Sequence, residues 1–361
     1  MKTIRDIDVE GKVILLRADL NLPMDEAGEI MSDLRLRAVL PTIEYLRENG
    51  ARKIYIISHL GRPEGRDERY TMKRVAERFR ELYGDVVYVD DVAGEKVKRA
   101  GEVDAKGTKS DEAMKCPVII LENLRFYPGE KAGDAEFIRA IIESTGAEVY
   151  VQDAFAVLHR KHASVVAAKD VCRELGVAYV YGLLVEKEVE GLSRVVTEPE
   201  RPLVVIIGGA KVEDKQPLID KFAGIADKII VGGKIAADGY TTDLPNVYVA
   251  EDFDTDAEGN GVDVGPVSMS KVVNEITDAA TVVWNGLLGK TEDPAYATAS
   301  TIVAEMMGEK YTATTVVCGG DTTGFVEELM DEHPSLDYTL ISTGGGAALE
   351  FLLNGTLVGL E

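Results

Sequence analysis

Residues 13–21 read VILLRADLN, an apolar run that ends in polar side chains. The apolar part, residues 13–16, predicts a buried strand. Strand alternation then places Arg17, Asp19 and Asn21 on one face of the chain. A cation, an anion and an amide at the end of a buried strand indicate a polar ligand at this position. The same order recurs along the chain, with an apolar run followed by Gly, Arg, Asn or Asp.

Twelve apolar, β-rich runs alternate with amphipathic stretches of helical period. The runs are 13–16, 53–57, 86–89, 118–121, 148–151, 177–180, 203–207, 228–231, 247–250, 281–284, 315–318 and 338–341. Helical patterns include 36–48, 72–82, 134–144 and 267–278. This alternation predicts an α/β fold with parallel sheets covered by helices on both faces. Twelve strands favour two doubly wound, Rossmann-like domains over one sheet.

We expect the domain boundary near residue 180, with domains 1–180 and 181–344. Residues 183–195 predict a charged helix that connects the two, and Pro-containing residues 197–202 follow it as a linker. Residues 101–109 are polar and predict a surface loop.

Composition excludes several classes of protein. The chain has 361 residues and a net charge of −23. Residues 1–180 carry a net charge of −3 and residues 181–361 a net charge of −20. Such acidity disfavours binding to nucleic acid, which needs Lys and Arg. We find no signal peptide in residues 1–12 and no long apolar run, so we expect no membrane span and a cytoplasmic protein. Three dispersed cysteines are typical of reduced thiols.

Arginines and histidines follow successive strands of the first half. Arg17 and then Arg35 follow the first strand, and the other members of this group are His59, Arg62, Arg125, His159, Arg160 and His162. One such arginine predicts only a surface ion pair. Several of them at strand ends, which meet at one sheet edge, predict a site for a small anion with carboxylate and phosphate groups. We interpret Asp19 as a partner of a hydroxyl or of an arginine, and His159 and His162 as structural residues.

The second half has glycine-rich turns after its strands. The first is Gly208-Gly209, followed by Lys211 and Lys215, which lie four residues apart and share a face if this stretch is helical. Comparable turns are Gly232-Gly233, Asn285-Gly286, Gly319-Gly320-Asp321-Thr322 and 343–346. One glycine pair fits tight packing equally well, whereas repeated turns predict phosphate binding through backbone amides. Asp321 predicts a magnesium ligand.

A nearby sequence resembles the end of a phosphate-binding P-loop. Residues 289–291 read GKT, but Trp284 stands where the first glycine is required. The phosphates must therefore be bound by several separate turns. A covalent nucleophile has no support either, because the chain has no GxSxG sequence and no candidate Cys–His pair.

Nine segments in the same order resemble phosphoglycerate kinases. They are LLRADLN (15–21), DLRLRA (33–38) with LPTI (40–43), SHLGRP (58–63), LENLRFYPGE (121–130), DAF (153–155) with HRKHAS (159–164), GGAKVEDK (208–215), VVWNG (282–286), GGDTT (319–323) and STGGGAALEFL (342–352). The resemblance implies two domains hinged across a cleft, with residues 345–361 returning to the first. It also implies reversible phosphoryl transfer between ATP–Mg²⁺ and the carboxylate of 3-phosphoglycerate, giving 1,3-bisphosphoglycerate and ADP, a step of glycolysis and gluconeogenesis.

The resemblance also implies a role for individual residues. Contacts to phosphoglycerate fall on Asp19, Asn21, Arg35, His59, Arg62, Arg125 and Arg160. Arg35, Lys211 and Lys215 take catalytic roles by stabilising the transferred group. Nucleotide contacts fall on Lys215, Gly232, Gly233, Asn285, Glu292, Gly319, Gly320, Asp321 and Thr322, with Asp321 at the metal. We expect a monomer, and we interpret Arg17 as ion-pair support.

The sequence departs from the family pattern mainly around the nucleotide. Leu287 replaces the usual proline, Lys290-Thr291 replaces Val-Phe, and Cys318 replaces a glycine. Ala156 replaces a glycine in a way that resembles archaeal members. The preference for a nucleotide base therefore stays open. A regulatory binding protein without activity, and a kinase for another phosphorylated acid, remain alternatives, and a two-domain solute-binding protein fits the sequence least.

Overall fold

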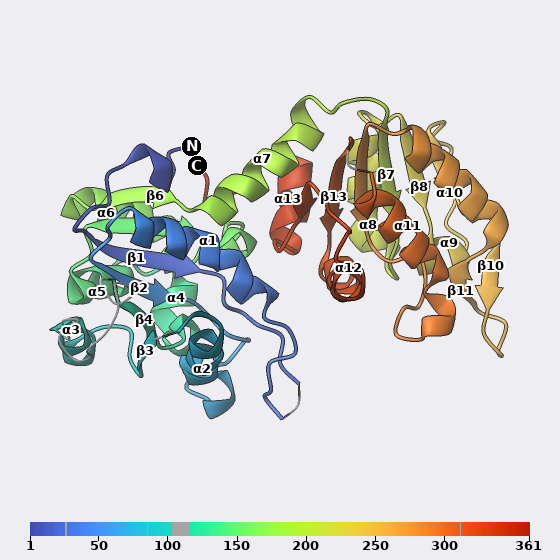
Figure 1. Cartoon of the computed structure of the whole chain (residues 1–361). Helices are drawn as coiled ribbons and strands as arrows, with labels where there is room; N and C mark the ends of the chain where they lie inside the picture. Colours follow the sequence, from blue (N-terminus) through green and yellow to red (C-terminus); the bar gives the residue numbers. More distant parts are fainter. Residues whose placement is uncertain (26, 85, 103–115, 311) are drawn as a thin grey trace. The chain divides into compact units, whose positions relative to one another are not determined.

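The computed structural model describes residues 1–25, 27–84, 86–102, 116–310 and 312–361. The chain divides into two compact units, Met1–Lys187 with Val358–Glu361 and Glu188–Leu357 (Figure 1). We consider each unit by itself. Most of the expected surface loop 101–109 lies outside the described residues, and residues 101 and 102 belong to helix α3.

The first unit is built on a parallel six-stranded sheet in the order β3-β4-β2-β1-β5-β6. Its strands are β1 (Val13–Ala18), β2 (Lys53–Ile57), β3 (Val86–Val89), β4 (Val118–Leu121), β5 (Val149–Asp153) and β6 (Ala178–Tyr181). All six residues of the central strand β1 are buried, because helices cover both faces of the sheet. The solid apolar blocks of the sequence reflect this double cover.

Alternate residues of β1 enter two different cores. Ile14, Leu16 and Ala18 pack with helices α1 (Leu34–Glu48) and α2 (Met72–Tyr83). Val13 and Leu15 pack on the opposite face with α3 (Glu95–Glu102), α5 (Ala135–Thr145) and α6 (Ala168–Leu175). The unit also contains α4 (Pro128–Ala132), a π-helical turn η7 (Ala163–Ala167), and the short 3-10 turns η1 (Ile4–Asp6), η2 (Glu68–Tyr70), η5 (Leu124–Phe126) and η6 (Phe155–Val157).

The chain passes into the second unit through α7 (Leu183–Thr197). The buried Asp153, at the end of β5, accepts hydrogen bonds through Oδ1 from the backbone N–H groups of Leu184 (2.9 Å) and Val185 (3.2 Å). The hydroxyl of Thr42 accepts one from the N–H of Leu183 at 3.1 Å. The first turn of α7 therefore has its free donors satisfied by side chains of the first unit.

The second unit contains another parallel six-stranded sheet, in the order β14-β13-β12-β7-β8-β9. Its strands are β7 (Leu203–Ile207), β8 (Lys228–Val231), β9 (Val247–Val249), β12 (Thr281–Asn285), β13 (Thr314–Cys318) and β14 (Leu340–Ile341). The buried indole of Trp284 packs in the core with α10 (Pro266–Asp278) and α11 (Thr298–Gly308). The other helical elements are α8 (Val212–Ala223), α9 (Gly233–Ala237), α12 (Gly320–Glu332), α13 (Gly346–Asn354) and the 3-10 turn η8 (Pro294–Tyr296).

The two six-stranded parallel sheets confirm the predicted α/β class with two Rossmann-like domains. An antiparallel hairpin of β10 (Phe253–Thr255) and β11 (Gly261–Val264) was not predicted from the sequence. We expected residues 345–361 to belong with the first unit, but α13 groups with the second unit and only Val358–Glu361 group with the first. The reason is that α13 contacts α8.

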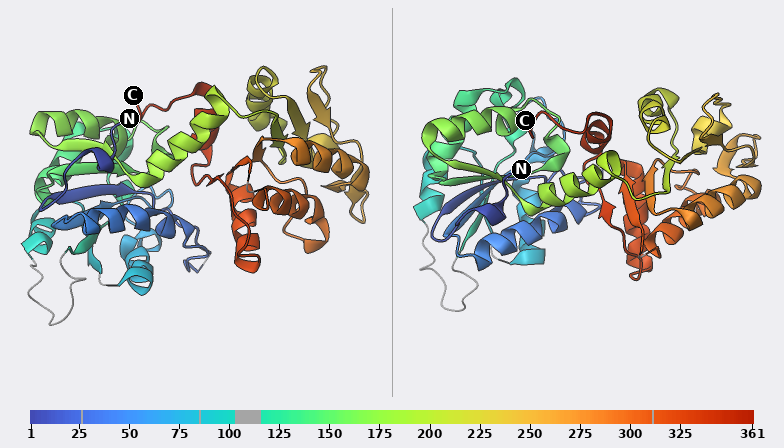
Figure 2. Two further views of the ribbon diagram at one scale, coloured as in Figure 1. Left: turned by 45° about the horizontal axis from the view of Figure 1, so that its top comes forward. Right: turned by 90° about the horizontal axis from the view of Figure 1, so that it is seen from above.

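Both chain ends belong to the first unit (Figure 2). The N–H of Gly359 donates to the carbonyl of Leu158 at 2.8 Å, and the hydroxyl of Tyr181 donates to the carbonyl of Gly359 at 2.7 Å. In the described part of the chain, no helix combines the length and the apolar character that a membrane crossing requires.

Candidate active site

The three polar residues at the end of β1 have different partners. Arg17 is fully buried and lies beside the imidazole of His59 and the hydroxyl of Ser164. The Asp19 carboxylate is 2 % exposed and forms an ion pair with Arg35, near the start of α1. The side-chain oxygen of Asn21 accepts a hydrogen bond from the N–H of Gly61 at 2.7 Å. Among the residues that the structure describes, Arg17 forms no ion pair, so our interpretation of it as ion-pair support was wrong.

Arg125 lies among several other cations. Burial, and after it the charges of the neighbouring Arg17, Arg160 and Arg62, lower its pKa to about 10. Its guanidinium donates to the carbonyl of Gly61. Within the described ranges, the buried Nε of Arg125 has no hydrogen-bond partner. A buried donor without a partner is costly, and an anion placed here would satisfy it.

Two histidines of this cluster, His59 and His162, are neutral at physiological pH. The pKa of His59 lies well below its usual value because of burial first and then the charge of Arg17 and of other cations. The pKa of His162 falls to about 4, again because of burial first and then nearby arginines. These rings therefore offer hydrogen bonds, and the arginines supply the positive charge of the cluster.

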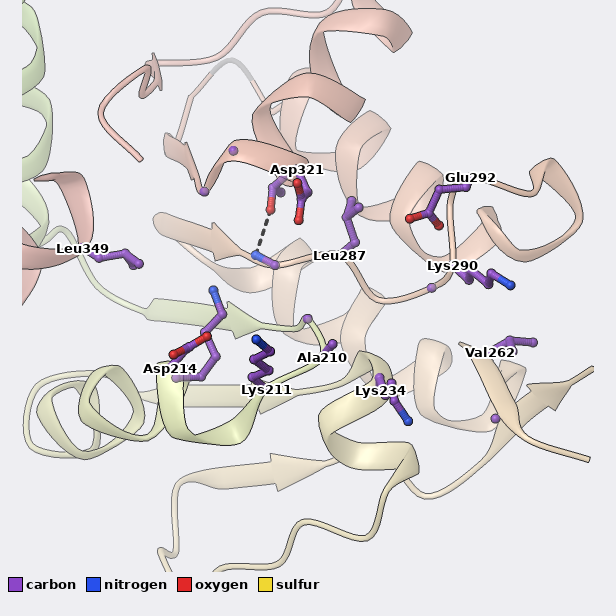
Figure 3. Close-up of a pocket in the computed structure, with 18 residues that line it drawn as sticks. Ala210, Lys211, Asp214, Lys234, Val262, Leu287, Lys290, Glu292, Asp321 and Leu349 are labelled. Atoms are coloured by element: carbon purple, nitrogen blue, oxygen red, sulfur yellow. Dashed lines mark hydrogen bonds between the residues drawn. The ribbon is translucent and has the colours of Figure 1, made fainter. Parts of the chain in front are cut away.

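The second unit contains a cavity of about 730 Å³ at the carboxyl ends of its central strands. The loops after β7, β12 and β13 form most of its wall. The lining residues are Gly209, Ala210, Lys211, Asp214, Lys215, Lys234, Gly261, Val262, Gly286, Leu287, Gly289, Lys290, Glu292, Gly319, Gly320, Asp321, Thr322 and Leu349. Figure 3 shows Asp321 on the side of the cavity opposite Lys211 and Asp214. A ligand with phosphate groups fits a pocket that combines lysines with glycine-rich turns.

Lys215 is held at the cavity wall by a buried amide. Its ammonium group donates to the side-chain oxygen of Asn285, which is fully buried. The amide nitrogen of Asn285 donates in turn to the carbonyl of Cys318 at 3.0 Å and to its sulfur at 3.3 Å. Burial lowers the pKa of Lys215 from its usual value. Asn285 is therefore a support of Lys215 and does not line the cavity itself.

Gly232 and Gly233 also do not line the cavity, although we predicted nucleotide contacts for them. Gly233 has φ +63°, and a Cβ there would lie 2.6 Å from the carbonyl oxygen of Leu287. A Cβ on Gly232 would lie 2.7 Å from the side chain of Leu288. Both glycines allow the loop after β12 to pack closely, which is the tight-packing alternative for a glycine pair.

Helix α12 begins at the cavity with Gly320 and Asp321. Gly319 before it has φ +100°, and the hydroxyl of Thr322 accepts a hydrogen bond from the N–H of Gly286 at 2.8 Å. Free N–H groups at this helix start favour an anion. The described residues contain no group of three His, Cys, Asp or Glu side chains that could bind a metal ion. A cation here would combine the exposed Asp321 carboxylate with oxygens from a ligand and water, as Mg²⁺ does in nucleotide sites.

Sequence reasoning missed part of both sites. Gly261 and Val262 belong to the hairpin whose strands contain no apolar run. Leu287 and Lys290 were named only as departures from the family pattern around the nucleotide, and Gly289 between them was not assigned, although all three closely follow the WNG sequence. In the first unit, the buried Glu130 and Ser164 are in contact at 2.6 Å, and both lie inside segments that we quoted for the family resemblance.

Comparison with known proteins decides the family. The family model of phosphoglycerate kinase matches residues 4–243 and 240–355. The chain belongs to the phosphoglycerate kinase family. A phosphoglycerate kinase from Coprothermobacter proteolyticus is 36% identical and covers 100% of this chain and 98% of its own length. The one from Pelotomaculum thermopropionicum is 37% identical over the same shares of the two chains.

Solved structures of phosphoglycerate kinases share the whole architecture. The enzyme from Pyrococcus horikoshii superimposes with a TM-score of 0.82 at 28% identity and covers 100% of this chain and 98% of its own. The enzyme from Coxiella burnetii gives a TM-score of 0.75, also at 28% identity, with 99% and 97% covered. The fold and the family predicted from the sequence are thus both confirmed.

Proposed function

We propose that this chain transfers a phosphoryl group reversibly between ATP and the carboxylate of 3-phosphoglycerate. The observation that carries the proposal is that one chain of this family contains both a cationic cluster and a cavity suited to phosphate groups. The first unit has a cationic cluster around Arg125, whose buried Nε has no partner in the described residues. The second unit has a cavity with lysines and glycine turns at the ends of its strands.

The first unit binds the acid in this proposal. Arg62, Arg125 and Arg160 take its phosphate and carboxylate oxygens, because guanidinium groups suit both. Asp19, Asn21 and His59 bind its hydroxyl and the remaining oxygens. Asp19 also orients Arg35, with which it forms an ion pair. Arg35 contributes charge to the group being transferred.

The second unit binds the nucleotide. Lys211, Lys215 and the start of α12 bind its phosphates, and Glu292 binds the ribose. Mg²⁺ would be held by Asp321 together with phosphate oxygens, and it would neutralise charge on the phosphates when bound. The acceptor is already a carboxylate, so this chain needs no general base. Its residues catalyse transfer by positioning the two substrates and by neutralising charge.

A coupled assay tests the proposal. The chain is supplied with 3-phosphoglycerate, Mg²⁺ and ATP, and consumption of the nucleotide is followed. We expect turnover, and a screen of GTP and other triphosphates in place of ATP defines the base preference. Absence of turnover with every triphosphate would refute the proposal. Binding of both ligands without turnover would instead support a regulatory protein.

We also propose that the chain works as a monomer in the cytoplasm. Two separate sites within one chain need no second copy to complete them. Light scattering during size-exclusion chromatography should give a mass near 39.2 kDa. A stable dimer would contradict this part of the proposal.

A further inference from the structure

A chain of buried hydrogen bonds connects α4 with the end of β1. The Glu130 carboxylate is 1 % exposed and accepts hydrogen bonds from the hydroxyl of Ser164 at 2.6 Å and from its N–H at 3.1 Å. Because the hydroxyl donates to Glu130, its oxygen is available to accept. It accepts from Nε of Arg17 at 3.0 Å, and Ser164 and Arg17 are both fully buried.

The same chain continues to His59. A terminal nitrogen of Arg17 lies 3.2 Å from Nδ1 of His59. A guanidinium group has only donors, so Nδ1 of His59 must be the acceptor. A neutral imidazole carries one proton, and this contact places it on Nε2.

We propose that Glu130, Ser164 and Arg17 are positioning residues that hold His59 as the neutral tautomer with its proton on Nε2. His59 then binds the acid substrate by donating a hydrogen bond, and it takes up no proton when the acid binds. This inference rests on the proposed function, because it assigns His59 to the acid-binding site of the first unit.

The charges around His59 favour this state of the ring. Burial lowers the pKa of His59 most, and the charges of Arg17 on β1, Arg125 on η5 and Arg35 on α1, together with His162, lower it further. Two buried carboxylates of this unit have partners of their own, since Asp19 forms an ion pair with Arg35 and Glu130 accepts from Ser164. A protonated ring would therefore lie among cations in a buried place, which is costly.

Arg17 orients the imidazole of His59, which a simple ion pair would not do. Nε of Arg17 donates to Ser164, which Glu130 orients, one terminal nitrogen donates to the carbonyl of Ala18, and the other directs a donor at Nδ1 of His59. Three bonds on one planar group fix its orientation more strictly than a single ionic contact does. The orientation of the imidazole, and with it the direction of Nε2–H, follows from Arg17.

The tautomer is measured directly by ¹⁵N NMR of the imidazole nitrogens in the full chain. The sequence has four histidines, so His59→Gln identifies the signals of His59. We expect Nδ1 of His59 to resonate as an unprotonated nitrogen and Nε2 as a protonated one between about pH 5.5 and about pH 8. A proton on Nδ1, or a doubly protonated ring at neutral pH, would overturn the inference. The tautomer is read from the spectrum of the unaltered chain, and the variant serves only to assign the signals.

The positioning role is tested by Ser164→Ala, which removes the hydroxyl between Glu130 and Arg17. We expect a mixture of His59 tautomers and a KM for 3-phosphoglycerate raised by about tenfold, with kcat changed much less. Ser164→Thr keeps the hydroxyl and should restore both readouts. Thr145→Val is the matched control, because Thr145 is buried in α5 and its hydroxyl donates to the carbonyls of Ile141 and Ile142 in the same helix. An unchanged tautomer and KM in Ser164→Ala would refute the role of the hydrogen-bond chain.

The two proposals fail separately. Should the predicted tautomer be found in a chain that turns over no triphosphate, the proposed function is wrong and the account of His59 stands. Should the chain be active while the His59 proton is on Nδ1, the account of His59 is wrong and the proposed function stands.

Discussion

Arg35 is the residue on which the proposed transfer depends most. Its guanidinium pairs with Asp19 and keeps 27 % of its side chain exposed, so it is oriented and still accessible. We expect Arg35→Ala to lower kcat by orders of magnitude, because Arg35 would act on charge that develops during transfer. Arg37→Ala is the control, since Arg37 lies two residues further on in α1, has 59 % of its side chain exposed and forms an ion pair with Asp33. Steady-state kinetics distinguishes the roles, and a raised KM with unchanged kcat would exclude the transition-state role.

Lys215 is the corresponding residue of the nucleotide unit. We expect Lys215→Ala to lower kcat and to weaken nucleotide binding, because the ammonium lies at the cavity wall on Asn285. Burial lowers its pKa, so this lysine should lose its proton, and with it activity, at a lower pH than an exposed lysine does. A pH profile of kcat and titration calorimetry with ATP measure both effects. Lys221→Ala, in the last turn of α8, is the control, and unchanged kinetics in Lys215→Ala would remove it from the site.

At the residue scale, the sequence predicts which side chains lie at the candidate site better than it predicts which groups they contact. Arg125 and His59 could be predicted as site residues because each follows a strand, and parallel strands end at one edge of a sheet. The partners of Arg17 could not be predicted, since Ser164 lies far along the chain and only the fold brings it close. Glycines present the same difficulty: Gly233 and Gly320 both begin helices, and only the fold shows that Gly233 packs under a loop while Gly320 lines the cavity.

At the scale of elements, the loop after β12 depends on the start of α9. We expect Gly233→Ala to displace Leu287, because the new Cβ would lie 2.6 Å from the Leu287 carbonyl oxygen, and Gly233 also has φ +63°. The displaced loop lines the cavity, so nucleotide affinity should fall along with stability. Gly239→Ala is the control, because Gly239 has φ +91° with open space around it. Calorimetry with ATP compares the two, and equal affinities would show that the close contact has no effect on the site.

Helix α7 begins on a buried carboxyl group, which makes its first turn sensitive to pH. Burial raises the pKa of Asp153 to about 7. Because the pKa of Asp153 is higher in the folded chain than in the unfolded chain, its protonated form stabilises the fold. This contribution is fully present when the pH is below the pKa of the unfolded chain, and it is lost as the pH rises through about 7. Asp153→Asn keeps an acceptor for the N–H groups of Leu184 and Val185 and removes this titration. We therefore expect the stability of the unaltered chain to fall more between about pH 4 and about pH 7 than that of the variant, measured by urea unfolding. If the stability of the unaltered chain and of Asp153→Asn changed equally with pH, Asp153 would not be the group responsible.

Strands were predicted well where apolar blocks stand between polar residues. The bounds of β2 and β7 agree with the sequence pattern, because both strands are covered on both faces and need solid apolar runs. The β10–β11 hairpin is different. Phe253–Thr255 and Gly261–Val264 are partly exposed and contain Asp and Gly, so their pairing depends on backbone hydrogen bonds that leave no apolar pattern.

At the scale of the whole molecule, the last residues of the chain support the acid-binding unit. The N–H of Gly359 donates to Leu158, and Leu158 directly precedes the segment with His159 and Arg160. We expect a chain that ends at Leu357 to bind 3-phosphoglycerate more weakly while it retains its affinity for ATP. Tyr181→Phe, which removes only the hydroxyl contact to Gly359, should have a smaller effect. Calorimetry with each ligand measures the two affinities. An equal loss of affinity for 3-phosphoglycerate and for ATP would contradict the claim that the last residues support the first unit alone.

The proposed function requires the second unit to bind an anion in spite of its own charge. Residues 181–361 carry a net charge of −20, which repels ATP at long range. Lysines 211, 215, 234 and 290 line the cavity and oppose this field where the phosphates would lie. Affinity for the nucleotide is therefore a property of a few side chains and turns, not of the whole surface.

All three cysteines are buried, two in the first unit and one in the second. Burial raises the pKa of the thiols to about 11 for Cys116, about 12 for Cys172 and about 11 for Cys318. Alkylating reagents attack thiolates, so these groups should react only when the protein around them opens. The chain thus contains its own reporters of local opening. Mass spectrometry of labelled peptides would measure the alkylation of Cys116 and Cys172 separately from that of Cys318. It would therefore follow the opening of each unit without any introduced probe.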